Sequence, residues 1–187
     1  MLGLIAATAG LLGAATATRP GLGAATPSNA QRLPDGIVFS GLTGGSYAFD
    51  GWRGQPILVA NTASLCGFTA QLDDLQALYD RYRDRGLIVF GVPSNDFRQE
   101  LATDEEVAEF CAVNFALDFP MASLNSVRGP DAHPFFRWLS DIHGFTPNWN
   151  FNKVLIGPEG DLLGTWRASA RPVSRPIRRA VEAALMG

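Results

Sequence analysis

Cys66 is the residue of this sequence whose type and position best suit a chemical role. It stands within residues 61–69, after an apolar run and just ahead of a segment with helical periodicity. Open α/β folds place reactive groups at the carboxyl ends of parallel strands, and a helix N-terminus offers N–H donors and partial positive charge to an anion. We therefore interpret Cys66 as a thiol that reacts as the thiolate. A buried structural cysteine is the alternative, because free cysteines are often core residues.

Two strands and two helices must position Cys66. Residues 56–61 and 87–92 are near-continuous apolar runs, which is typical of parallel strands covered on both faces. Residues 72–82 repeat apolar side chains at helical spacing and predict the crossover helix between these strands. The capping-box pattern at residues 103–106 predicts a second helix, whose apolar positions, Val113 included, should pack on the sheet.

The remaining segments complete the fold. Residues 153–156 and 161–166 flank a Gly-Pro-Glu-Gly turn and predict an antiparallel hairpin, and residues 176–186 predict a closing helix. A further hairpin is expected within residues 37–49, where it should cover an edge of the sheet. Together these elements predict an α/β fold, a thioredoxin-like sandwich whose central mixed sheet carries helices on both faces.

The N-terminal segment predicts export. Residues 1–13 are apolar but too short to span a bilayer, and Ala15-Thr16-Ala17 fits a signal-peptide cleavage site. We therefore expect a signal peptide at 1–17, a flexible linker at 18–35, a domain at 36–187 and a periplasmic or extracellular protein without a membrane span after processing. Because no basic residue precedes Arg19, a Gly/Ala-rich tail on a cytoplasmic protein is the alternative.

The charge distribution argues against a nucleic-acid partner, and the spacing of the histidines argues against a metal site. The net charge is -3 and no stretch gathers Lys or Arg into a patch that could track phosphates, which argues against nucleic-acid binding. His133 and His143 are not paired with cysteines or carboxylates at ligand spacing, so no metal site is expected, and His133 instead suits a helix start before Pro134. No cofactor is implied.

Three ordered segments, residues 59–69, 91–100 and 149–153, are similar to motifs of the glutathione peroxidase family. The resemblance extends from about Phe39 to Leu185 and implies a thioredoxin-like fold and a peroxidase acting in the response to oxidative stress. It also implies four catalytic residues: Cys66 as the peroxidatic nucleophile, with Gln99, Trp149 and Asn150 as its hydrogen-bonding partners.

The chemistry of these side chains fits that assignment. An indole N–H and two carboxamide groups are neutral donors, suited to a sulfur anion and to the oxyanion of a leaving group. The alternatives are a core tryptophan, a turn asparagine and a surface glutamine. Only one residue separates Phe97 from Gln99, where the family usually has two, so Asp96 or Asn95 could take part of the place of Gln99.

The resemblance also limits the reductant and the assembly. A hydroperoxide substrate and either glutathione or a thioredoxin-type protein as reductant are implied. Cys111 lies one position before the resolving cysteine of thioredoxin-dependent relatives, so it is either a structural core residue or a resolving thiol that forms an internal disulfide. The segment between Ser140 and Trp149 is short, which implies a compact monomer.

Two other functions share these residues. Cys66 could oxidise and pass its oxidation to a partner protein, as a non-catalytic redox sensor or relay does. An exported thiol-disulfide oxidoreductase is a weaker alternative, because Cys66-Gly67-Phe68-Thr69 lacks the second cysteine of a Cys-x-x-Cys pair. Repeated turnover with a thiol reductant separates the enzyme from the relay.

Overall fold

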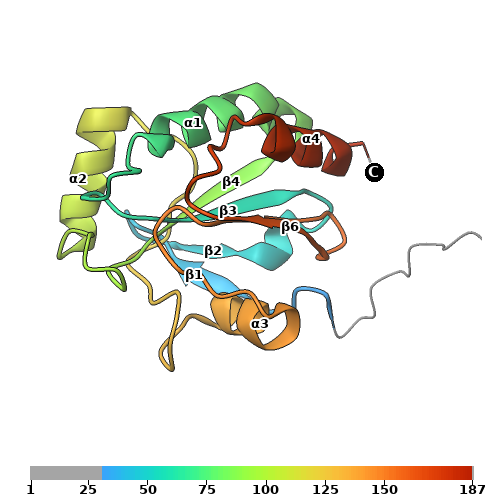
Figure 1. Cartoon of the computed structure of the whole chain (residues 1–187), viewed down its shortest axis with the longest axis horizontal. Coiled ribbons are helices and arrows are strands. Elements are labelled where there is room, and N and C mark those ends of the chain that lie inside the picture. The colour runs from blue at the N-terminus through green and yellow to red at the C-terminus, as the bar shows by residue number, and fades with distance from the viewer. Residues whose placement is uncertain (1–30, 187) are drawn as a thin grey trace, which may run out of the picture.

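A four-stranded mixed sheet forms the centre of the computed structural model, which describes residues 31–186 (Figure 1). Its strands are β3 (Ile57–Thr62), β4 (Ile88–Pro93), β5 (Lys153–Ile156) and β6 (Leu162–Trp166), in the order β4-β3-β5-β6. β3 runs parallel to β4 and antiparallel to β5, and β5 forms a hairpin with β6. The predicted mixed sheet is confirmed.

Helices cover both faces of this sheet, as expected. α1 (Gln71–Tyr82), which continues into the short 3-10 helix η3 (Arg83–Arg85), and α4 (Arg175–Ala184) lie on one face, and α3 (Pro134–His143) lies on the other (Figure 1). β3 is buried along its whole length. Its alternate side chains enter two separate core clusters, with Leu58 on the α1 side and Val59 on the α3 side. The apolar run therefore reflects a strand that is buried on both faces of the sheet.

The N-terminal hairpin covers more than an edge. β1 (Val38–Ser40) pairs antiparallel with β2 (Ser46–Ala48), which leads into the 3-10 helix η2 (Phe49–Trp52). The rings of Phe39 and Phe49 lie 5.1 and 5.2 Å from that of Phe90 on β4, so the hairpin packs on the face that α3 also covers.

Packing begins ahead of the expected domain boundary at residue 36. Leu33 is buried, and its N–H donates to the Gly160 carbonyl at 2.7 Å. The expected signal peptide and residues 18–30 of the expected linker lie outside the described residues. Among residues 31–186, no helix is long and apolar enough to cross a membrane.

α2 (Asp104–Phe115) begins with the predicted capping box, in which Thr103 and Glu106 exchange side-chain and backbone hydrogen bonds. Its burial differs from the expectation. Val107 and Cys111 are buried, whereas Val113 is 75% exposed, so the inward position predicted for Val113 is wrong. The reason is placement: α2 stands at the end of the sheet rather than across its face (Figure 1).

Candidate active site

Cys66 lies in the loop that joins the carboxyl end of β3 to the N-terminus of α1. A series of turns carries the chain between these elements, with hydrogen bonds from Thr69 N–H to the Cys66 carbonyl at 3.0 Å and from Gln71 N–H to the Phe68 carbonyl at 2.8 Å. The side chain of Cys66 is mostly buried, and the Phe68 N–H points at its sulfur with an N···S distance of 3.5 Å. The loop thus directs a backbone donor at the thiol.

Thr69 fixes the conformation of this loop. Its hydroxyl oxygen accepts the Cys66 N–H at 3.1 Å and lies 2.6 Å from the Cys66 carbonyl oxygen and 2.9 Å from that of Ala63. One small side chain is therefore bonded to both backbone groups of Cys66, its N–H and its carbonyl. Sequence reasoning assigned Thr69 no role, although its place three residues after the cysteine is typical of a side chain that bonds local backbone.

Gln99 and Asn150 meet beside this loop. The Asn150 amide donates to Gln99 Oε1 at 3.0 Å, and the Gln99 carbonyl accepts the N–H of Leu65, the residue before Cys66, at 2.8 Å. Asn150 is fully buried, and its Oδ1 has no partner among the described residues. The pair thus joins the end of the β4 loop to the turn before β5, next to the cysteine loop.

The shortened loop reaches this position through a left-handed residue. Arg98 has a φ of 57°, which lets the chain turn sharply between Phe97 and Gln99. The two alternatives to Gln99 bond elsewhere: Asp96 accepts the N–H of Val127 at 2.7 Å, and Asn95 accepts that of Glu100 at 3.3 Å. Among these residues, Gln99 is the one hydrogen-bonded to Asn150.

Asn61, at the end of β3, clamps the turn that carries Trp149 and Asn150. Its amide donates to the Trp149 carbonyl at 3.1 Å, and its Oδ1 accepts the Asn152 N–H at 3.0 Å. Phe151 adopts a φ of 58° within this turn, and its N–H donates to the Asn61 carbonyl. Sequence reasoning missed Asn61, whose signal was a polar residue closing a buried apolar strand.

Trp149 lies at the rim of the site. Its side chain is 41% exposed and its ring lies 5.5 Å from that of Phe97. Within residues 31–186, no hydrogen bond joins the Cys66 sulfur to the side chains of Gln99, Trp149 or Asn150. The structure therefore brings Gln99 and Asn150 into direct contact, and it couples them to Cys66 through the backbone of Leu65.

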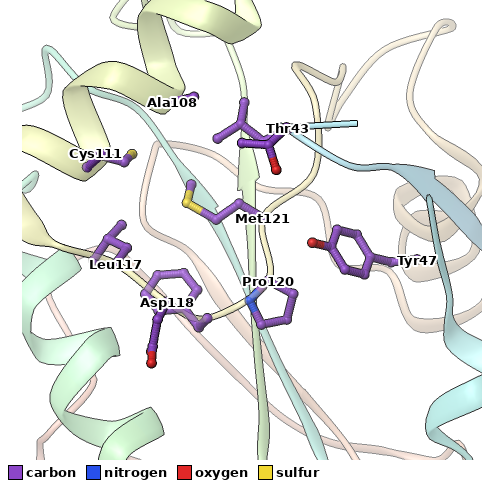
Figure 2. A pocket seen from close by; sticks show the side chains of 11 residues that line it. Thr43, Tyr47, Ala108, Cys111, Leu117, Asp118, Pro120 and Met121 are labelled. Carbon is purple, nitrogen blue, oxygen red and sulfur yellow. The ribbon is translucent and has the colours of Figure 1, made fainter. Parts of the chain in front are cut away.

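Cys111 has a different environment from Cys66. It faces a cavity of about 340 Å³ between α2, β2 and the segment around Met121 (Figure 2). Burial, reinforced by the nearby Glu100 carboxylate, raises the pKa of the Cys111 thiol to about 11. Both cysteines are free. Cys111 is thus a protonated thiol at neutral pH, and a protonated thiol is a poor nucleophile.

The histidines have structural partners. His133 caps the start of α3, as predicted, and its ring stacks on Phe39 with centroids 3.6 Å apart. Burial lowers the pKa of His133. His143 lies edge-on to Trp138 in the last turn of the same helix. In the described part of the chain, no group of three or more potential ligands could hold a metal ion.

Curated relatives of this chain carry glutathione peroxidase in their names. Residues 37–140 match the family model for glutathione peroxidase. The chain is 39% identical over 144 residues to the glutathione peroxidase homolog BsaA of Staphylococcus aureus (strain MW2), which covers 74% of this chain and 90% of that protein. It is 37% identical over 134 residues to the glutathione peroxidase-like peroxiredoxin gpx1 of Schizosaccharomyces pombe, covering 69% and 85%.

Solved structures agree with the fold. The crystal structure of Trgpx in apo form matches with a TM-score of 0.63 and 28% identity, covering 80% of this chain and 93% of that one. A thioredoxin-family thiol:disulfide interchange protein from Chlorobium tepidum matches with a TM-score of 0.65, covering 86% and 99%, and at 15% identity it supports the thioredoxin-like fold alone. On the family match and the identities to its relatives, this chain belongs to the glutathione peroxidase family.

Proposed function

We propose that this protein is a thiol-dependent peroxidase that reduces hydrogen peroxide or organic hydroperoxides through Cys66. The observation that carries the proposal is the loop between β3 and α1, where the Phe68 N–H lies 3.5 Å from the Cys66 sulfur and the Gln99–Asn150 pair is bonded to the same loop. A backbone donor favours the thiolate, which is the nucleophile that attacks an O–O bond.

The reaction balances with two equivalents of thiol. The Cys66 thiolate attacks one peroxide oxygen, the O–O bond breaks, and the alkoxide or hydroxide leaves as an alcohol or water after taking a proton from solvent. Cys66 is then a sulfenic acid, which condenses with a first thiol to a mixed disulfide and releases water. A second thiol attacks this mixed disulfide, forms a disulfide with the first thiol and releases the Cys66 thiol. Oxidation and reduction of Cys66 are thus separate half-reactions, which gives ping-pong kinetics.

Gln99, Asn150 and Trp149 are proposed to stabilise the charges of the first step. Their amide and indole N–H groups are neutral donors, and none is a base at neutral pH. Because Asn150 is fixed by Gln99 and by burial, its remaining hydrogen-bonding groups are already oriented when a peroxide arrives. Such preorganisation avoids reorganisation in the transition state.

The environment of Cys111 favours the one-cysteine route. A resolving thiol must attack the sulfenic acid as a thiolate, and burial beside Glu100 disfavours that form of Cys111. We propose an external reductant for both thiol steps, either glutathione or a thioredoxin-type protein. An internal disulfide with Cys111 is the competing route.

The rim of the site favours organic hydroperoxides. Leu65 is 62% exposed, Phe68 38% and Trp149 41%, so each of the two site loops carries apolar side chains that face solvent. Exposed apolar groups gathered at a site favour apolar ligands. We propose that a peroxide with an alkyl or aryl group reacts faster than hydrogen peroxide.

The setting of this activity is a separate proposal. The leader-like residues 1–17 support export and a role in defence against peroxides outside the cytoplasm. Sequencing the N-terminus of the protein recovered from a cell-envelope fraction tests cleavage after Ala17. An unprocessed chain in the cytoplasm would contradict export.

We also propose that the protein is a monomer. The mass measured by light scattering tests this assembly.

Peroxide consumption by protein lacking residues 1–17 tests the catalytic proposal, with glutathione and a thioredoxin system supplied separately. Sustained turnover should vanish in Cys66→Ser and survive in Cys111→Ser. Loss of thioredoxin-dependent turnover in Cys111→Ser would instead support the internal disulfide. If wild-type protein reacts once and then stops with either reductant, it is a redox relay rather than a peroxidase.

A further inference from the structure

Lys153 is the sole lysine of this sequence, and the other 14 of its 15 basic residues are arginines. It lies on β5 and is fully buried, although Lys is among the residues most rarely found in a protein interior. Its ammonium group donates to Gln71 Oε1, to the Ala170 carbonyl at 2.7 Å and to the Ala168 carbonyl at 3.4 Å. Three acceptors around one nitrogen match the three donors of an ammonium group.

Lys153 projects to the face of the sheet that carries Cys66. Its register partner on β3 is Ala60, and cross-strand partners place their side chains on the same face. Ala60 and Cys66 belong to the same core cluster, beneath α1. The lysine therefore reaches α1 from below, at the turn of the helix that follows the cysteine loop.

A continuous series of hydrogen bonds runs from Lys153 to the cysteine sulfur. Lys153 donates to the side chain of Gln71, the Gln71 N–H donates to the Phe68 carbonyl at 2.8 Å, and the Phe68 N–H lies 3.5 Å from Cys66 Sγ. Gln71 is itself buried, and its amide also donates to the Ala168 carbonyl at 2.7 Å. The first turn of α1 is thereby held from inside the core.

We propose that Lys153 is a positioning residue for the reaction of Cys66: its ammonium group holds Gln71, and through it the Phe68 N–H that faces the sulfur. The inference rests on the proposed function in taking Cys66 as the reacting thiol. It adds a residue of β5 that does not touch the peroxide but sets the donor geometry around the thiolate.

The ammonium form is the one that supports the site fully, because a neutral amine has only two donors for the three acceptors. Burial lowers the pKa of Lys153 to about 7, and the Asp74 carboxylate on α1 opposes this shift. Asp74 in turn accepts two hydrogen bonds from Arg171, at 2.6 and 2.7 Å, and the positive charge of Arg171 offsets part of its effect on Lys153. Lys153 therefore changes its charge within the physiological pH range, and the support it gives Cys66 should weaken as the pH rises.

The test compares the rate at which iodoacetamide alkylates Cys66 in wild type, Lys153→Met and Lys153→Arg, read by mass spectrometry from about pH 5.5 to about pH 9.5. At the acidic end we expect Lys153→Met to react about tenfold more slowly than wild type, which is the effect of losing about one oriented hydrogen bond to the reacting sulfur. The ratio should shrink as the pH rises through the titration of Lys153. Lys153→Arg, which stays charged, should keep the wild-type rate at low pH.

The titration of Lys153 can be followed independently of any variant. Because the sequence has one lysine, 13C-lysine labelling gives a single Cε signal, and its pH titration should have a midpoint near the lowered pKa of about 7. A midpoint near the ordinary lysine value would overturn the pH dependence even if a variant failed to fold.

The matched control is Arg175→Met, which removes an exposed positive charge at the start of α4 with the same replacement side chain. It should leave the alkylation profile unchanged. A Lys153→Met rate that differs from wild type by one constant factor at every pH would reduce Lys153 to a purely structural role, and equal rates would refute the inference. Alkylation needs no peroxide, so a failure here is distinguishable from a failure of the peroxidase proposal.

Discussion

Replacing Lys153 with methionine should change how the stability of the protein depends on pH. The methionine side chain has a similar length and no charge, so it can follow the apolar part of the lysine side chain between β5 and α1. Gln71 and the Ala168 and Ala170 carbonyls lose a donor, but the Ala168 carbonyl still accepts a hydrogen bond from the Gln71 amide at 2.7 Å. The folded variant should therefore retain the site loops well enough for a stability comparison.

The sign follows from where the proton is bound. Burial lowers the pKa of Lys153 from 10.5 to about 7 in the folded protein, so between these values the unfolded lysine holds a proton that the folded one lacks. The contribution of Lys153 to the free energy of unfolding then rises with pH across this window, by about 1.4 kcal/mol per pH unit. Over the whole window the rise is at most about 5 kcal/mol, and relaxation around the buried amine would reduce it. The Lys153→Met variant has no such group, so its stability should lack this rise.

Urea denaturation of wild type and Lys153→Met at several pH values between about 6 and about 10, under reducing conditions, measures this difference directly. The wild-type minus variant free energy of unfolding should increase steadily with pH, and Arg175→Met should show no comparable trend. A difference that is the same at every pH would show that Lys153 titrates alike in the folded and unfolded states. A difference that falls with rising pH would refute the argument from burial.

Three further outcomes follow from the site loops. Thr69→Val removes the hydroxyl that bonds the N–H and the carbonyl of Cys66. It should lower the free energy of unfolding, measured by urea denaturation, by about 1–3 kcal/mol, and it should slow the first reaction with peroxide, measured by stopped-flow. Unchanged values would show that Thr69 does not fix the loop. Arg98→Gly relieves a left-handed backbone at φ 57° and should raise the free energy of unfolding by about 0.5–1 kcal/mol; a lower value would contradict that strain. In native protein at about pH 8, iodoacetamide should modify Cys66 at least about tenfold faster than Cys111, whose thiol has a pKa raised to about 11; comparable rates by mass spectrometry would count against the burial of Cys111.

The secondary structure was largely predictable because its signals are local. Apolar runs marked β3 and β4, apolar residues at helical spacing marked α1, and the Thr103–Glu106 capping box fixed the start of α2. The same signals could not say where α2 would stand. Helical periodicity identifies an apolar face but not the surface that covers it, and so the exposure of Val113 was missed.

The site also combines features that the sequence predicts with features that depend on tertiary packing. Cys66 could be found from its place between a buried strand and a helix, and Gln99 and Asn150 through a family resemblance, but their mutual hydrogen bond depends on how far the shortened loop reaches. That reach is set by the left-handed backbone of Arg98, a conformation that nothing in its side chain signals.

By itself, the sequence determined which segments form the sheet and its helices, and which cysteine follows a strand end, because these depend on neighbouring residues. The tertiary structure alone decided which distant groups meet. The clamp from Asn61 to the turn at Trp149 and the burial of Lys153 beneath α1 both require β5 to pair with β3 in one register. A shift of one residue would turn Lys153 to the opposite face of the sheet, and only the packing of the whole core selects between those registers.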